Sequence, residues 1–202
     1  MAIRWVAVIA NGAEPVTPGE RTAMAVCAAC VCCDRLPPPG APPLLQVVGD
    51  LDSLGACALP PAMVTDLHAD QETNDLAKAQ AWLRVHEPAA QLAYFGVTGL
   101  REDHTLGNLA LIAAGPAPAR VLTASGRFEL LPAGHHEVKV AAQHPVSFLS
   151  FVPQRVTVRG VVWPVEGLLL DTLWRATLNR TLADSLVVDC EAPLFLFQPW
   201  RS

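Results

Sequence analysis

The apolar positions in the first 125 residues form short runs that alternate with segments of helical spacing. Strands are predicted over residues 3–10, 31–33, 44–48, 64–68, 92–95 and 120–123. Helices are predicted over residues 20–29, 73–86 and 105–114, with Thr73 as the cap of the second. Strands separated by helices are typical of a mainly parallel sheet with helices on both faces. This half of the chain is therefore predicted to be a Rossmann-like α/β domain.

The pattern changes after Gly126, where short runs rich in Val, Leu and Phe are separated by Pro and Gly. These runs cover residues 137–142, 146–151, 155–162, 168–170, 185–190 and 194–198. Residues 156–159 alternate between apolar and polar side chains, as antiparallel strands with one buried face do. We therefore expect two domains, residues 1–125 and residues 126–202, the second being a small antiparallel β-sandwich.

Composition narrows the classes of function. The chain has 202 residues, and 51% of them are hydrophobic, which is enough to form a real core. Its net charge of -5, from 19 acidic and 14 basic residues, argues against a broad nucleic-acid-binding surface. No apolar run is long enough to span a membrane. We expect a soluble cytoplasmic protein that binds neither nucleic acid nor membrane.

The cysteines permit two interpretations. Four of the six are clustered and two lie far away, the cluster being Cys27, Cys30, Cys32 and Cys33 and the others Cys57 and Cys190. Cys30 and Cys33 have the spacing of a metal-binding or redox pair. A structural zinc site usually needs a second such pair, so the preferred interpretation is that the cluster consists of small buried hydrophobic residues.

Two carboxylates follow the apolar run at 44–48. Asp50 and Asp52 are two residues apart, so in an extended chain their side chains point the same way. Two carboxylates this near to each other are not easily ionised together unless a cation lies between them. Oxygen ligands at the end of an α/β strand suit Mg²⁺, which usually binds together with phosphates. The alternative is that both residues only form a turn or cap a helix.

Asp75 lies in a second acidic segment, residues 70–79. It falls in the first turn of the predicted helix, where the helix dipole favours a carboxylate. Again the simpler interpretation is a well-formed helix start. At the carboxyl edge of an open α/β sheet, however, this segment would meet Asp50 and Asp52.

A third segment, residues 95–108, carries a glycine-containing loop between a strand and a helix. Gly96 and Gly99 permit close approach of a ligand to the backbone, and Arg101 can form a fork onto phosphate oxygens. His104 and Asn108 lie one turn apart on the helix, whose first amides can bind an anion. Taken alone, the segment is a loop followed by a helix cap.

Together these segments resemble the thiamine pyrophosphokinase family. The matching motifs are Gly-Asp-x-Asp-Ser at 49–53, Gln-x-x-x-Asp-Leu-x-Lys-Ala at 71–79 and Gly-x-x-Gly-x-Arg-x-Asp-His at 96–104. The resemblance extends to residues 9–12, 130–135, 156–163 and 177–179, and so covers nearly the whole chain.

The resemblance implies a reaction of ATP with thiamine that gives thiamine diphosphate and AMP. It implies a homodimer whose active sites combine the nucleotide- and Mg²⁺-binding α/β domain of one subunit with the thiamine-binding β-domain of its partner. Mg²⁺ would be held by Asp50, Asp52 and Asp75. The catalytic set would also include Arg101 and Asp103, with Asp103 facing the thiamine hydroxyl. The nucleotide would contact Asn11, Asp34, Gln71, Thr73, Gly96, Gly99, Arg101, His104 and Asn108. Thiamine would contact Thr177 and Asn179.

The chain also departs from the family pattern. The usual Ala-Asp-Gly-Gly reads Cys33-Asp34-Arg35-Leu36 here, so two glycines are lost. Arg35 is then either an added phosphate contact or a solvated loop arginine. Two other functions stay open: a non-catalytic protein that binds thiamine or a nucleotide, and a pyrophosphokinase that acts on another small alcohol.

Three tryptophans of the second half could stack on a heteroaromatic cation, namely Trp163, Trp174 and Trp200. The preferred interpretation places them in sandwich cores or in interfaces.

Overall fold

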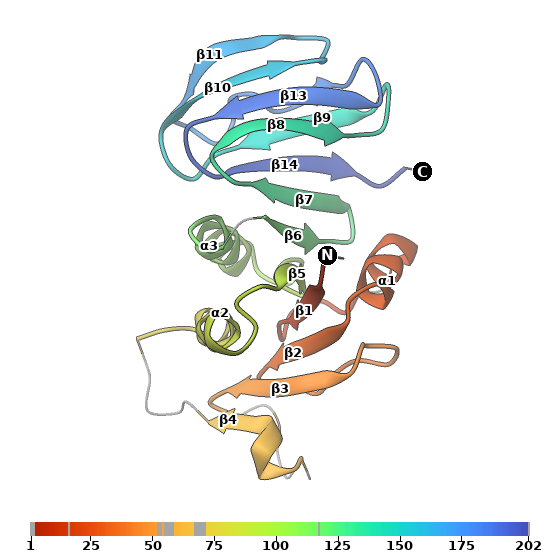
Figure 1. Cartoon of the computed structure of the whole chain (residues 1–202), viewed down its shortest axis with the longest axis vertical. Coiled ribbons are helices and arrows are strands. Elements are labelled where there is room, and N and C mark those ends of the chain that lie inside the picture. Colours follow the sequence, from red (N-terminus) through yellow and green to blue (C-terminus); the bar gives the residue numbers. More distant parts are fainter. Residues whose placement is uncertain are drawn as a thin grey trace. The chain divides into compact units, whose positions relative to one another are not determined.

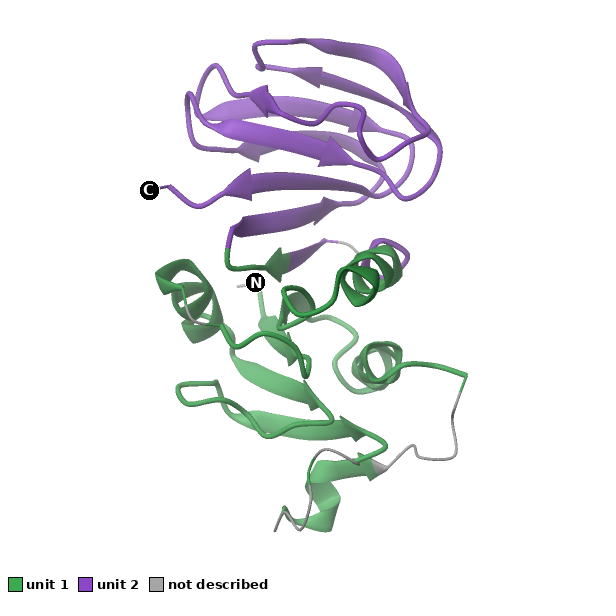
Figure 2. Ribbon diagram, turned by 180° about the vertical axis from the view of Figure 1, so that it is seen from behind, with its two compact units in different colours: residues 1–111, 121–124 green, residues 112–120, 125–202 purple. Residues whose placement is uncertain are grey.

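The computed structural model describes residues 3–15, 17–51, 54, 59–66, 72–116 and 118–201. The chain divides into two compact units (Figure 2). Unit 1 comprises residues 1–111 and 121–124, and unit 2 comprises residues 112–120 and 125–202.

Unit 1 is built on a parallel sheet. Its strands are β1 (Trp5–Ile9), β2 (Ala29–Cys33), β3 (Leu44–Gly49), β4 (Val64–Asp66) and β5 (Gln91–Phe95), followed by β6 (Ala119–Leu122), which the two units share. The strand order is β4-β3-β2-β1-β5-β6, and β1 pairs in parallel with both β2 and β5. The chain therefore runs outward from β1 in one direction and later returns to its other side. In an open α/β sheet, such a switch point is where ligands bind.

Helices cover both faces of this sheet. Figure 1 shows α1 (Pro18–Ala25) on one face and α2 (Asp75–His86) and α3 (Glu102–Ala113) on the other. A short 3₁₀ helix, η1 (Pro61–Met63), precedes β4. The centre of the sheet is buried: all five residues of β2 and the last four of β1 are buried. The predicted α/β class is confirmed.

Several predicted boundaries are wrong. The helix predicted over residues 20–29 is Pro18–Ala25, capped by Thr17, because Thr17 and Glu20 exchange hydrogen bonds in a capping box. Ala29 and Cys30 instead belong to β2. Thr73 is not the cap of α2. The adjacent Asn74 takes that role, its side chain accepting a hydrogen bond from the Ala77 amide at 2.9 Å. The helix predicted over residues 105–114 begins earlier, at Glu102.

Unit 2 consists of two antiparallel four-stranded arrangements, so the predicted antiparallel character is confirmed. One has the order β12-β9-β14-β7 and the other β11-β10-β13-β8. Their strands are β7 (Gly126–Leu131), β8 (Gly134–Lys139), β9 (Pro145–Leu149), β10 (Gln154–Arg159), β11 (Val165–Leu170), β12 (Asn179–Arg180), β13 (Ser185–Cys190) and β14 (Leu194–Pro199). Buried side chains from both arrangements form one hydrophobic cluster, in which Phe148, Val158, Val188 and Leu194 are fully inaccessible. Packing across this cluster is the main source of stability of the unit.

Within the described part of the chain, no helix combines the length and the apolar character needed to cross a membrane.

Candidate active site

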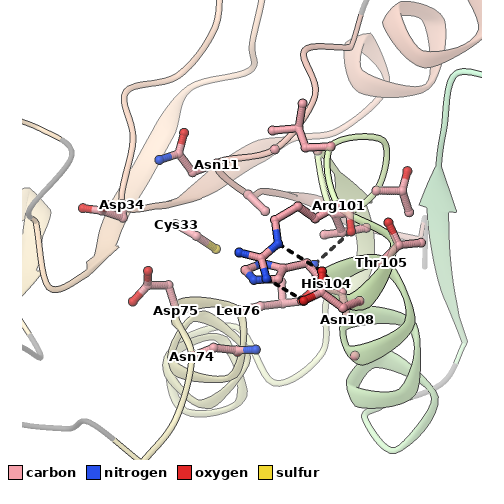
Figure 3. A pocket seen from close by; sticks show the side chains of 18 of the residues that line it. Asn11, Cys33, Asp34, Asn74, Asp75, Leu76, Arg101, His104, Thr105 and Asn108 are labelled. Atoms are coloured by element: carbon pink, nitrogen blue, oxygen red, sulfur yellow. Dashed lines mark hydrogen bonds and ion pairs between the residues drawn. The ribbon is translucent and has the colours of Figure 1, made fainter.

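A cavity of about 770 Å³ opens at the carboxyl ends of the strands of unit 1 (Figure 3). Its walls come from the loops after β1, β2, β3 and β5 and from the first turns of α2 and α3. The predicted site residues that line it are Asn11, Asp34, Asp50, Asp75, Gly96, Arg101, Asp103, His104 and Asn108. The segments therefore meet at the sheet edge, as the alternation of strands and helices predicts.

The loops after β1 and β5 are in direct backbone contact at the switch point. A Cβ on Gly12 would lie 1.8 Å from the Gly96 carbonyl oxygen, so only glycine fits at that position. Gly96 has φ 66°, a left-handed conformation that glycine adopts without strain. The Ala10 amide also donates to the Phe95 carbonyl at 2.9 Å. This packing fixes the relative position of two walls of the cavity.

Three carboxylates converge on one side of the cavity. Asp34 follows β2, Asp50 follows β3 and Asp75 opens α2, and one oxygen from each lies within 4.8 Å of those of the other two. Asp34 is buried and has φ 47°, which is an uncommon conformation for aspartate. Hard oxygen donors this close form a set that fits a divalent cation such as Mg²⁺. Sequence reasoning had assigned Asp34 only to the nucleotide, although an aspartate after each of two neighbouring parallel strands is a signal for this cluster.

A buried ammonium lies behind the acidic cluster. Lys78, one turn along α2, places its Nζ 3.4 Å from Asp75 Oδ1, and its side chain is 4% exposed. Burial raises the pKa of Asp75, and so do the nearby charges of Asp50 and Asp34, while Lys78 opposes the shift. Lys78 was not among the predicted site residues. Its position three residues after Asp75 in a helix was the available signal.

The opposite side of the cavity carries a cation. Arg101 forms a fork with Asp103, its Nε 3.0 Å from Oδ1 and its Nη2 2.5 Å from Oδ2. This pair and the His104 amide, which donates to Asp103 at 2.9 Å, lower the pKa of Asp103 to about 2. Figure 3 shows Arg101 and His104 across the cavity from Asp34 and Asp75. Carboxylates that can hold a metal, opposite a guanidinium that can contact an anion, suit a metal-bound polyanion.

Asn108 makes a structural contact beside the cavity, and its predicted contact with the nucleotide stays a prediction. Its Nδ2 donates to the Val97 carbonyl at 2.9 Å, so its amide holds the loop after β5 against α3. Its side chain lines the cavity in this arrangement.

Arg35 is neither a solvated loop residue nor part of the cavity lining. Its Nη2 lies 2.5 Å from Glu14 Oε1, and its side chain is only 14% exposed. The ion pair between the loops after β1 and β2 argues against a solvated arginine, and a contact of Arg35 with phosphate stays a prediction.

The clustered cysteines are buried free thiols. Cys27, Cys30, Cys32 and Cys33 all lie in or just before β2, with Cys33 at the cavity wall. Burial, followed by the negative charges of Asp75 and Asp34, raises the pKa of the Cys33 thiol. The acidic cluster is the group of possible metal ligands found among the described residues, and no cysteine belongs to it. The preferred interpretation of buried hydrophobic residues agrees with this arrangement.

Some predicted residues are not placed in the cavity. Asp52 and Gln71 lie outside the described residues. Thr73 is exposed and, like Gly99, does not contribute to the cavity lining. A Cβ on Gly99 would lie 3.1 Å from the Ala13 side chain, so this glycine serves close packing of two loops.

The two residues predicted to contact thiamine belong to unit 2. Thr177 donates its hydroxyl to the Trp174 carbonyl at 2.8 Å. Asn179 is buried, donates to the Trp163 carbonyl at 2.7 Å and accepts from the Trp163 amide at 3.2 Å. Asn179 thus fixes the backbone beside Trp163. Trp163 and Trp174 are exposed, so they do not fill the sandwich core. The other part of that interpretation, a place in an interface, stays a prediction.

Comparison with known proteins shows which solved structures share this fold. No protein-family model matches the chain, and neither does any curated protein. Solved structures do match it. The thiamine pyrophosphokinase from Bacillus subtilis matches with 18% sequence identity and a TM-score of 0.74, over 98% of this chain and 100% of that one. The one from Geobacillus thermodenitrificans matches with 22% identity and a TM-score of 0.75, over 98% of both chains. The chain has the fold of the thiamine pyrophosphokinases.

The likeness extends beyond bacteria. Yeast thiamin pyrophosphokinase matches with 13% identity and a TM-score of 0.71, over 99% of this chain and 87% of that one. The resemblance found in the sequence motifs is thus confirmed at the level of the fold over both units.

Proposed function

We propose that the protein is a Mg²⁺-dependent thiamine pyrophosphokinase. It would transfer the pyrophosphoryl group of ATP to the hydroxyl of thiamine and give thiamine diphosphate and AMP. The observation that carries the proposal is the convergence of Asp34, Asp50 and Asp75 opposite Arg101 in one cavity at the switch point of this fold. A clustered set of carboxylates would have little use in a protein that only binds thiamine.

The acidic cluster is the proposed metal site. Mg²⁺ held there would neutralise triphosphate charge and orient the β-phosphorus for in-line attack. Asp34, Asp50 and Asp75 would share the metal contacts, and Asp52 stays a proposed ligand from its place in the motif. Lys78 would keep Asp75 charged before the metal arrives, since its ammonium contacts that carboxylate.

Residues around the glycine loop are proposed to hold the nucleotide. The Gly96 backbone, Asn11 and the first amides of α3 would contact phosphate oxygens, with Thr98 and His104 on the same wall. Gln71, Thr73 and Gly99 remain proposed contacts from the resemblance. Arg101 would exchange its fork on Asp103 for one on the transferring phosphates, where a bidentate guanidinium stabilises developing charge.

Asp103 is proposed to receive the thiamine hydroxyl. The pKa of Asp103 is about 2 beside Arg101, and even at the ordinary value of an aspartate, about 4, this carboxylate is a weak base. Its role is therefore mainly to accept a hydrogen bond that aims the hydroxyl at the β-phosphorus. The proton can leave late, because the transition state of phosphoryl transfer is loose.

The two units would divide the work. We propose that unit 1 binds ATP and Mg²⁺ and that unit 2 binds thiamine. Unit 2 would also form the contacts of a homodimer, with active sites at the subunit interface. The protein would act in the cytoplasm. In unit 2, Asn179 would act by holding the Trp163 backbone, and Thr177 would lie beside it on the thiamine-binding surface.

AMP release in the presence and absence of thiamine tests the proposal. Thiamine-dependent AMP is expected, and Asp50→Ala should lower turnover at least about a hundredfold. Thiamine binding without AMP would point to a non-catalytic homologue, and AMP with a different alcohol would change the acceptor. Near-normal turnover of Asp50→Ala would remove the metal assignment.

A further inference from the structure

The ion pair between Glu14 and Arg35 has no part in the function as proposed so far. Arg35 directly follows Asp34, a member of the acidic cluster, and Glu14 lies in the loop after β1. Their charged atoms are 2.5 Å apart. Arg35 Nε also donates to the Leu36 carbonyl at 3.0 Å, so the guanidinium is fixed by two contacts. Its low exposure shows that it is held in the protein rather than extended into solvent.

On the Glu14 side, the pair acts on a loop that forms one wall of the cavity. Residues 10–15 contain Asn11 and Gly12, which line the cavity. Gly12 is packed on the Gly96 carbonyl, and Ala13 contacts the position of Gly99, so this side of the loop is fixed against the loop after β5. The ion pair fixes the loop in the other direction, toward β2.

On the Arg35 side, the pair acts on the residue after Asp34. The Asp34 amide donates to the Val48 carbonyl at 3.0 Å, but the residue has φ 47°. A non-glycine residue in this conformation is strained and persists only when its neighbours hold it. Arg35 is the next residue, and its contacts with Glu14 and with the Leu36 carbonyl restrain the backbone that follows Asp34.

We infer that Glu14 and Arg35 are positioning residues that preform the site for a metal-bound nucleoside triphosphate. Their ion pair joins the loop that carries Asn11, a proposed phosphate contact, to the loop that carries Asp34, a proposed metal ligand. These two sides of the cavity are therefore fixed relative to each other before the ligand binds. This inference rests on the proposed function and deepens it, because it assigns preorganisation of that site to two residues outside the cavity.

The effect should fall on binding rather than on turnover. Without the ion pair, the loops must be ordered when the ligand arrives, and this cost weakens affinity. Once Mg²⁺ and the triphosphate are bound, their own contacts hold the loops, so the bound complex reacts at its usual rate.

The test uses isothermal titration calorimetry with Mg²⁺ and α,β-methylene ATP, an analogue in which the bond that would be cleaved is blocked. Glu14→Gln and Arg35→Met should each weaken binding about two- to fivefold, the range for an ion pair with one exposed partner, since the Glu14 side chain is 54% exposed. The double variant should bind the analogue as tightly as the single variant of lower affinity does, because each single substitution already removes the same contact. Arg35→Lys should recover part of the affinity. In AMP-release assays the KM for ATP should rise while kcat stays within about twofold.

The matched control is the ion pair of Arg4 and Glu87, which is also in unit 1 but at the start of β1. Arg4→Met should leave analogue binding unchanged. Equal binding by wild type and Glu14→Gln, or multiplicative losses in the double variant, would overturn the inference. If the affinity differences appear but wild type releases no AMP with thiamine, the proposed reaction fails and the inference stands. If the wild-type protein does not bind the analogue, both the proposed function and the inference fail.

Discussion

Replacing Lys78 with methionine removes the buried ammonium that lies 3.4 Å from Asp75 while keeping most of the side-chain volume. Asp75 would then face Asp34 and Asp50 without a neutralising charge. We expect the metal-free protein to lose stability and Mg²⁺ to restore much of it, because a bound cation would replace the missing positive charge.

The magnitude follows from the geometry. At 3.4 Å and an effective dielectric constant of about 20, the Coulomb attraction is about 5 kcal/mol. Removing one partner of a fully buried ion pair costs about 3–5 kcal/mol. The Asp75 side chain is 30% exposed, and water can solvate part of the charge that is left. We therefore expect a loss of about 2–3 kcal/mol in the free energy of unfolding.

Urea unfolding with and without Mg²⁺ measures both effects. Arg84→Met is the matched control, since Arg84 is an exposed cation on the same helix; it should change stability by less than about 0.5 kcal/mol. The reasoning is refuted if Lys78→Met is as stable as wild type without metal. It is equally refuted if Mg²⁺ leaves the difference between the two proteins unchanged.

Three further experiments, two with variants and one by chemical labelling, test other parts of the site. Gly12→Ala should destabilise the protein by about 2–4 kcal/mol in urea unfolding, since its Cβ would overlap the Gly96 carbonyl; a smaller loss would mean that these loops can separate. In Arg101→Met, the pKa of Asp103, about 2 in the wild type, should rise toward the ordinary value of an aspartate, because the fork is lost; carbon-13 NMR titration that shows no rise would disprove the pairing in solution. Burial raises the pKa of the Cys33 thiol, so iodoacetamide should label it only after denaturation. Labelling of the folded protein, seen by peptide mass spectrometry, would contradict that burial.

The alternation of strands and helices was sufficient to predict which segments meet. Asp50, Asp75 and Arg101 follow elements whose ends lie at one edge of a parallel sheet, so topology alone brings them together. The helix ends were harder, because Thr73 and Asn74 are both good caps and only the hydrogen bond to Ala77 distinguishes them.

Contacts between loops could not be predicted from the sequence. The pairing of Glu14 with Arg35 depends on how two loops are folded, and no periodicity encodes it. Asn179 shows the same limit, because its partners are backbone groups of Trp163, which leave no trace in the pattern of side chains. The membership of Asp34 in the acidic cluster required the adjacency of β2 and β3.

The thiols of β2 have a consequence for how this protein is made. In the native state Cys30, Cys32 and Cys33 are shielded on a strand with neighbours on both sides, where oxidants have little access. In a newly synthesised or refolding chain the same groups are exposed and close together, and a cross-link there would prevent the segment from extending into the sheet. Reducing conditions therefore matter during assembly of the fold far more than during the working life of the finished protein.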